Sequence, residues 1–245
     1  MSATVALRCD FVLMMCEDDT PRRLSVKELA RLATERLARL RADGAELSPV
    51  VNCSRKLAAN FWGSAWMRHL ACCEAGGLCL APGRTLLRHG CVLDLHIGPG
   101  QITALVSADE LYEVQLRLSP LSDEQLEQLR AACSGKIHSL VSLLEGKVDA
   151  AVLTQLCAPE VGLLPEPAEW HMNCTCPDWA EPCAHAAAAI YAVGTLFDAD
   201  PMLLFRLRSL EPSALLAAPQ VPCADTSFDS AALSSVFGIE LDVMP

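Results

Sequence analysis

Three cysteines and one histidine fall within twelve residues of this chain, in the stretch CTCPDWAEPCAH. They are Cys174, Cys176, Cys183 and His185, and they follow the pattern C-x-C-x(6)-C-x-H. Thiolate sulfur and imidazole nitrogen are ligands that zinc prefers, and four of them complete a tetrahedral shell. In a chain of this composition such a pattern is expected by chance only roughly 0.02 times. The spacing therefore predicts a zinc site.

The elements around this stretch must bring its two halves together. A short strand is expected over residues 169–173, and Pro177-Asp178 supplies a turn after the first two cysteines. Pro182 suits the first position of a helix expected over residues 183–197. Cys183 would then lie in the first helical turn, where the positive end of the helix dipole favours a thiolate. Ligands at a strand end and at a helix start can converge on one ion.

Two other uses of the same residues stay open. Cys174 and Cys176 could form a C-x-C dithiol in a redox protein, but that leaves Cys183 and His185 without a role, and a C-x-x-C at a helix start is absent. A catalytic zinc would need an open coordination position and a nearby base, whereas four protein ligands close the shell. A structural zinc site is preferred to both.

The remaining cysteines are expected to pack as small apolar residues or to have no chemical role. The chain has 13 cysteines, an odd number, together with an ample apolar fraction, which argues against a disulfide scaffold. Cys72 and Cys73 with Cys79 and His69 form a weak candidate for a second thiolate cluster. Single cysteines among apolar residues are expected in the core, namely Cys9, Cys16, Cys53, Cys133, Cys157 and Cys223.

Composition indicates a globular protein with 245 residues, of which 52% are hydrophobic and 20% charged. No window reaches the roughly 18 apolar residues of a membrane helix, and the N-terminal apolar patch lacks the features of a signal peptide. We therefore expect a cytoplasmic protein. Neither a phosphate-binding loop of the type G-x-x-x-x-G-K-[ST] nor a protease signature occurs, so we expect no enzymatic activity.

Charge is distributed unevenly along the chain. Residues 1–90 hold 13 Lys and Arg against 9 Asp and Glu, whereas residues 91–245 hold 6 against 21. No Lys or Arg occurs from Val148 to Phe205, the region that contains the cysteine stretch. Because affinity for DNA comes mostly from neutralising phosphates, direct DNA contact is more plausible for the basic N-terminal half. Its best candidate is the segment PGRTLLRHG, with Arg84, Arg88 and His89.

Hydrophobic periodicity predicts an α+β fold. A capping box, Ser25 with Glu28, opens a helix that closes at Gly44, and a second helix is expected from Gly63 to Glu74 with a core pair, Trp62 and Trp66. Alternation over residues 91–118 predicts a three-stranded antiparallel meander, followed by two or three helices up to residue 156. Four regions are expected: a helical N-terminal region (1–60), the meander with flanking helices (61–165), a small ββα zinc finger (166–210) and a loosely ordered tail (211–245), with a terminal helix near 230–237.

The spacing C-x-C-x(6)-C-x-H resembles the SWIM zinc finger, and residues 61–210 resemble bacterial SWIM zinc-finger proteins. The resemblance implies that Cys174, Cys176, Cys183 and His185 bind zinc, and that the protein accompanies a helicase-like, DNA-translocating ATPase. Ala184 stands between the last two ligands, where relatives often carry a basic residue. Three hypotheses follow: a protein-protein adaptor for such an ATPase, a DNA-binding protein that uses its basic N-terminal half, and a thiol redox protein.

Overall fold

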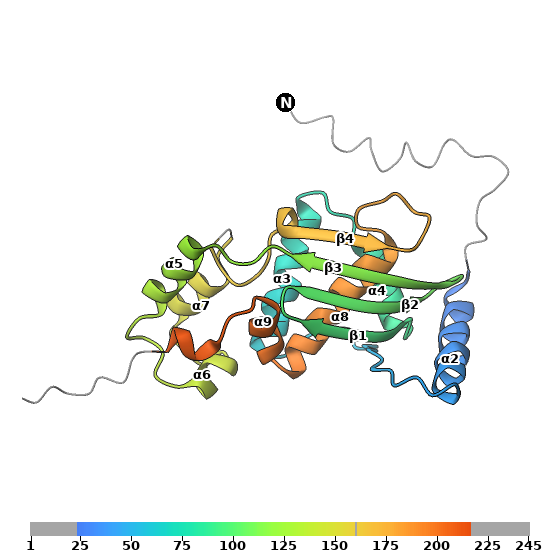
Figure 1. The fold of residues 1–245 in the computed structure, drawn as a ribbon, viewed down its shortest axis with the longest axis horizontal. Coiled ribbons are helices and arrows are strands. Elements are labelled where there is room, and N and C mark those ends of the chain that lie inside the picture. The colour runs from blue at the N-terminus through green and yellow to red at the C-terminus, as the bar shows by residue number, and fades with distance from the viewer. Residues whose placement is uncertain (1–23, 160, 217–245) are drawn as a thin grey trace, which may run out of the picture.

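The computed structural model describes residues 24–159 and 161–216, and it shows an α+β fold with a four-stranded antiparallel sheet (Figure 1). Its helices are α2 (Val26–Ala42), α3 (Phe61–Ala75), α4 (Ala81–Arg88), α5 (Asp123–Cys133), α6 (Leu140–Leu144), α7 (Ala150–Leu156), α8 (Ala184–Ala199) and α9 (Met202–Leu207). Its strands are β1 (Val92–Gly98), β2 (Gln101–Ser107), β3 (Leu111–Leu118) and β4 (Trp170–Cys174), and two 3-10 turns are η1 (Pro167–Glu169) and η2 (Pro212–Leu215). The predicted α+β class is confirmed.

Strands β1 to β3 form the predicted meander. Leu95 lies opposite Ala104 across β1 and β2, and Ala104 lies opposite Val114 across β2 and β3. Alternate side chains of β2 and β3 are buried, while those between them, such as Thr103 and Glu113, are exposed. The sheet therefore has one apolar face for the core and one polar face for solvent.

The sheet has a fourth strand, which the predicted three-stranded meander did not include. Residues 170–174 form a strand near the predicted place, but this strand, β4, pairs with β3, with Leu116 opposite Met172 and Val114 opposite Cys174. The free edge of β3 would otherwise present unpaired backbone N–H and C=O groups, which β4 satisfies. Sequence alternation identifies a strand without identifying its neighbour.

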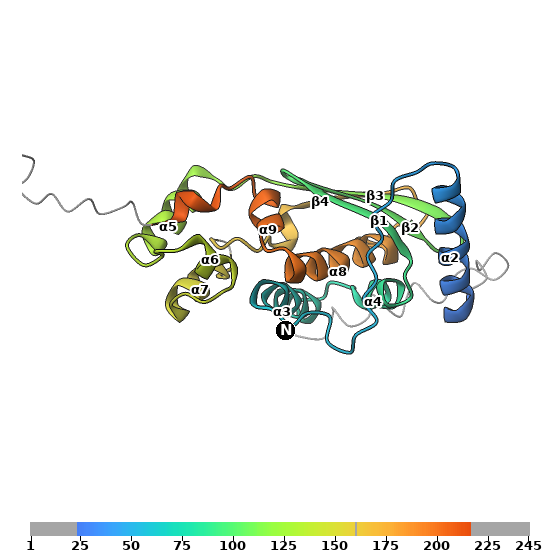
Figure 2. The same cartoon turned by 90° about the horizontal axis from the view of Figure 1, so that it is seen from below.

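Helix α8 forms a middle layer between the sheet and the pair α3 and α4 (Figure 2). It is apolar on all sides, as a helix covered on both faces must be, and its residues from Ala186 to Gly194 are buried. Small residues permit the close packing, since a Cβ on Gly83 of α4 would lie 2.3 Å from the backbone of Ala187. None of the helices within residues 24–159 and 161–216 has the length and apolar character needed to span a membrane.

Helix α3 is joined to α8 and to α6 through two tryptophans that are fully buried, as predicted. The indole N–H of Trp66 donates to the carbonyl of Ile190 in α8 (3.0 Å), and that of Trp62 donates to the carbonyl of Leu143 in α6 (3.1 Å). Each buried indole N–H thus has an acceptor, which offsets the cost of removing it from water. The pair is a core feature and is not available for stacking on bases.

Helix α2 begins and ends where its sequence predicts. Ser25 and Glu28 form the expected capping box, and Gly44 follows the helix with φ +91°. The guanidinium of Arg36 donates to the side chain of Ser107 and to the carbonyls of Ala108, Asp109 and Glu110. The helix is thereby attached to the turn between β2 and β3.

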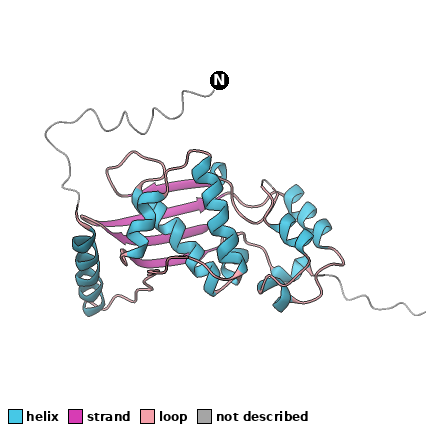
Figure 3. Ribbon diagram, turned by 180° about the vertical axis from the view of Figure 1, so that it is seen from behind, coloured by secondary structure: helices cyan, strands magenta, loops and turns pink. Residues whose placement is uncertain are grey.

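Helices α5, α6 and α7 lie beyond one end of the sheet (Figure 3). The Pro-rich stretch after α7 packs against the core, since its Leu163 and Leu164 are buried. Arg208, only 3% exposed, pairs with Glu169 (2.7 Å) and donates to the carbonyl of Leu163 (2.9 Å). This partly buried ion pair joins the end of α9 to the start of β4.

Several expectations fall on residues outside the described ranges. These include the terminal helix near 230–237 and most of the tail expected over 211–245, although η2 and Leu216 are described. Among the single cysteines expected in the core, Cys133 is buried and Cys157 is partly buried, whereas Cys53 is exposed in a loop, so that prediction was wrong. Cys9, Cys16 and Cys223 lie outside the described residues.

Candidate metal centre

The four residues of the cysteine stretch come together at the junction of β4 and α8. Cys174 is the last residue of β4, Cys176 follows two residues later, Cys183 caps the N-terminus of α8, and His185 lies in the first turn of that helix. Their ligand atoms, three sulfurs and one ring nitrogen, all lie within 4.8 Å of one another. The predicted convergence of a strand end and a helix start is therefore present.

The separations of these atoms fit a tetrahedral zinc site. The Nδ1 atom of His185 lies 3.9 Å from the sulfur of Cys174 and 4.0 Å from that of Cys183. With sulfur about 2.3 Å and nitrogen about 2.0 Å from zinc, a tetrahedron places them about 3.5 Å apart. The two measured separations exceed this value by about half an ångström or less, and the donor set of three thiols and one imidazole is the one zinc favours.

The loop between the two pairs is held by hydrogen bonds at its start and within it. Thr175 extends the pairing of β4 beyond its last residue, because its N–H donates to the carbonyl of Glu113 (3.1 Å) and its hydroxyl accepts from the N–H of Glu113 (3.0 Å). Asp178 accepts from the N–H of Ala180 (3.0 Å), which forms the expected turn. At the tip, Trp179 is 97% exposed. An aromatic side chain is thus presented to solvent from a constrained loop.

Cys183 precedes the first turn of α8, whereas it was predicted to lie within that turn. It is the N-cap of α8, and its sulfur accepts from the N–H of Ala186 (3.4 Å). Pro182 therefore precedes the cap and is not the first helical residue. The N-terminal N–H groups still face the sulfur, so the electrostatic argument for a thiolate at this position holds.

The pKa values of the thiols follow from this geometry. Burial raises the pKa of Cys183, but hydrogen bonds with His185, the Ala186 N–H and the sulfurs of Cys176 and Cys174 outweigh burial and lower it to about 7. Burial raises the pKa of Cys174 to about 12 and also raises that of Cys176. Near neutral pH, Cys183 is therefore the cysteine of this cluster that loses its proton most readily. Binding of a metal cation would have to displace the protons of Cys174 and Cys176.

Tyr112 supports His185, and the sequence analysis missed it. The two rings lie 4.2 Å apart at 32°, and the Tyr112 hydroxyl donates to the carboxylate of Asp109 (2.9 Å). Tyr112 is on the inward face of β3, two residues before Val114, which pairs with Cys174. The alternation of β3 indicates that Tyr112 is buried, but only the pairing of β3 with β4 places it beside the metal ligands.

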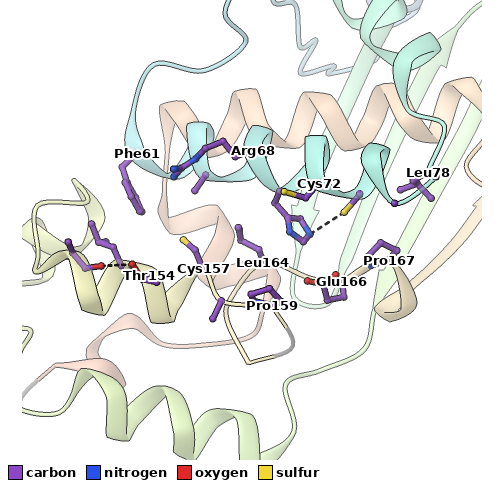
Figure 4. Close-up of a pocket in the computed structure, with 18 residues that line it drawn as sticks. Phe61, Arg68, Cys72, Leu78, Thr154, Cys157, Pro159, Leu164, Glu166 and Pro167 are labelled. Atoms are coloured by element: carbon purple, nitrogen blue, oxygen red, sulfur yellow. Dashed lines mark hydrogen bonds between the residues drawn. The ribbon is translucent and has the colours of Figure 1, made fainter. Parts of the chain in front are cut away.

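The weaker second cluster does not form a metal site. Cys72 and Cys73 of α3 face a cleft of about 1050 Å³ between α3 and α7, which Cys157 also lines (Figure 4). Within the described residues, the only group of three or more His, Cys, Asp or Glu side chains close enough to hold one ion is the four-residue cluster after β4. Cys79 is exposed. Burial raises the pKa of both Cys73 and Cys157 to about 11, which keeps these thiols protonated at neutral pH.

Asp94 and His96 of β1 lie close together on the polar face of the sheet. The His96 Nε2 atom lies 3.1 Å from Asp94, whose other oxygen accepts from the N–H of Ser48 (2.8 Å). The His96 side chain is largely exposed. The pair thus has the character expected of a polar sheet face rather than of a catalytic site.

Comparisons with known proteins support this site. Residues 172–194 match the family described as SWIM zinc finger. Over 141 residues the chain is 29% identical to the uncharacterized protein Rv2102 of Mycobacterium tuberculosis. The matched region covers 56% of this chain and 51% of that protein. The chain thus spans about half the length of this curated relative, and no solved structure matches it. The matched residues contain Cys174, Cys176, Cys183 and His185 in one cluster, and the chain carries a SWIM zinc finger.

Proposed function

We propose that this chain is a zinc-binding interaction protein without enzymatic activity, in which Cys174, Cys176, Cys183 and His185 hold one Zn²⁺. The observation that carries the proposal is the convergence of four sulfur and nitrogen donors within 4.8 Å. Four protein ligands leave no open coordination position, which is the arrangement of structural rather than catalytic zinc. The finger then serves to fix a surface.

The surface that such a centre fixes is the loop from Pro177 to Pro182. Bound zinc supplies local folding energy, on the order of 10 kcal/mol as apparent affinity in small fingers. The ligands on either side of the loop belong to β4 and to α8, which is the buried central helix. Fixing both ends reduces the conformational entropy that the loop loses when a partner binds.

The chemistry of this loop favours a protein partner. Trp179 is exposed between Asp178 and Glu181, and the sequence has no Lys or Arg from residue 148 to residue 205. Such a surface repels phosphates but suits a basic protein surface, because tryptophan is enriched among residues that dominate binding energy and its ring attracts cations. The resemblance to SWIM proteins leads us to propose a helicase-like, DNA-translocating ATPase as that partner.

The test measures binding between the full chain and a purified ATPase of this class by surface plasmon resonance. Trp179→Ala should weaken binding by about 30-fold, the loss typical of a central tryptophan. The matched control is Val141→Ala on α6, which removes another exposed apolar side chain (63% exposed) and should change binding less than about twofold. Equal affinities for wild type and Trp179→Ala would contradict the role of the loop.

The zinc content of each variant distinguishes a failure of the zinc site from a failure of the partner-binding loop. Trp179→Ala should retain zinc, because the side chain points to solvent and contributes no ligand atom. Removing zinc from the wild type with a chelator should weaken binding to the same partner. Undiminished binding by metal-free chain would refute the link between the finger and the partner surface.

A further inference from the structure

A basic cavity lies on the α3 and α4 side of the molecule. It has a volume of about 510 Å³, and its lining includes Arg55 and Lys56 from the loop before α3, Arg84 and Arg88 from α4, and Tyr191 from α8. No Asp or Glu is among its lining residues. None of these residues is a ligand of the zinc finger, so the cavity is a separate site.

The fold assembles this charge from two segments. Arg84 and Arg88 are four residues apart on α4 and therefore share one face of the helix. The loop that carries Arg55 and Lys56 is fixed by Asn52, whose side-chain amide donates to the carbonyl of Leu57 (2.7 Å) and to the hydroxyl of Thr195 in α8 (3.1 Å).

The acids of the protein leave most of this charge uncompensated. Arg84 pairs with Glu74 (3.1 Å) and donates to the hydroxyl of Tyr191, so it is a fixed wall of the cavity. Within the part of the chain that the structure describes, Arg55, Lys56 and Arg88 form no ion pair. Three positive charges therefore remain for a ligand.

Two guanidinium donors of the residues that line the cavity have no acceptor. The Nε atoms of Arg84 and Arg88 are buried and have no hydrogen-bond partner. Arg88 makes one contact through its Nη2 atom, a 3.4 Å hydrogen bond to the carbonyl of Arg55. Buried donors without acceptors are rare and costly in native proteins. An anion with several oxygens would accept from the cationic side chains that line the cavity, and a guanidinium group matches phosphate geometry.

We propose that this cavity binds a phosphate group, supplied either by a free polyphosphate or by the backbone of a nucleic-acid strand. Three uncompensated cations and the guanidinium edge of Arg88 suit a ligand with more than one negative charge. Tyr191 forms part of the cavity wall and follows His185 by six residues on α8, about 9 Å along the helix axis. One helix thus connects the phosphate cavity with the metal centre.

The experiment is calorimetric titration of the full, zinc-loaded chain at low salt, with pyrophosphate in one arm and a short single-stranded oligodeoxynucleotide in the other. Arg88→Gln should weaken binding at least about tenfold, as expected from loss of a charge-assisted hydrogen bond. Arg88→Lys keeps the charge but loses the planar fork, and should give an intermediate loss. Arg68→Gln is the matched control, since it removes one exposed charge from α3 outside this cavity.

Each outcome decides the proposal. Binding in either arm that Arg88→Gln weakens and Arg68→Gln leaves within twofold supports it, and the tighter arm identifies the source of the phosphate. No binding in either arm overturns it, and equal losses in both variants overturn it in favour of net charge alone. If zinc content or melting temperature shows that Arg88→Gln is unfolded, Lys56→Gln decides instead, because Lys56 is exposed and should weaken binding severalfold without affecting the fold.

Discussion

Replacing Gly83 by alanine should strongly destabilise the protein, because this glycine is where α4 approaches the central helix most closely. A Cβ at this position would lie 2.3 Å from the carbonyl carbon of Ala187 and from the N atom of Ala188. Ordinary van der Waals contact begins at 3.4 Å, so α4 and α8 would have to separate by about an ångström. The obstructing atoms belong to a helical backbone and cannot rotate away.

The expected cost follows from the packing of this interface. Overpacking a core costs typically 1–3 kcal/mol, and the rigid backbone places this variant near about 3 kcal/mol. For a chain of this size, that corresponds to a decrease in melting temperature of roughly 6–12 °C. Differential scanning fluorimetry of zinc-loaded protein, with urea unfolding as a second measurement, provides the test.

Gly98→Ala is the matched control for this prediction. An added Cβ there meets no atom closer than 3.5 Å, in the side chain of Gln101, and its backbone φ is not in the left-handed region. We therefore expect a change of less than about 1 kcal/mol. A Gly83→Ala protein that melts within about 2 °C of wild type, or no lower than Gly98→Ala, would refute the close packing of α4 on α8.

Two further predictions concern buried groups elsewhere. Arg208→Met should destabilise the chain by about 2–3 kcal/mol in urea unfolding, because Glu169, whose side chain is 20% exposed, loses its charged partner; a second change, Glu169→Leu, should recover only part of the loss, since Glu169 also accepts from the N–H of Glu166, and an unchanged midpoint for Arg208→Met would contradict the pairing. Alkylation mapped by mass spectrometry should modify the exposed Cys72 at pH 8 but Cys157 only as pH approaches its raised pKa of about 11, since the thiolate is the reactive form; rapid alkylation of Cys157 at pH 8 would contradict its burial and its raised pKa.

Local sequence signals predicted much of this fold. The capping box of Ser25 and Glu28 identified α2, and alternation over residues 91–118 identified the meander, because both depend on neighbours within a few residues. The four metal ligands were also identifiable, since their spacing within one short stretch limits the positions of their side chains. These features require no knowledge of distant contacts.

Features that depend on distant contacts were not predictable in the same way. The pairing of β4 with β3 places Tyr112 against His185, yet the two residues are far apart in the sequence. The segment with Arg84 and Arg88 is the best sequence candidate for DNA contact, but its sequence did not predict that it is a helix whose Gly83 packs against α8. The basic cavity is also lined by Arg55 and Lys56, which only the tertiary fold places beside Arg84 and Arg88.

The most direct test of the central claim is metal content per chain, measured by plasma mass spectrometry on protein purified without chelator. We predict one zinc per chain in the wild type and in Cys79→Ser, an exposed cysteine outside the cluster, and none in Cys176→Ser. A folded wild type without zinc, or a Cys176→Ser protein that retains it, would contradict the assignment of this cluster as a zinc finger.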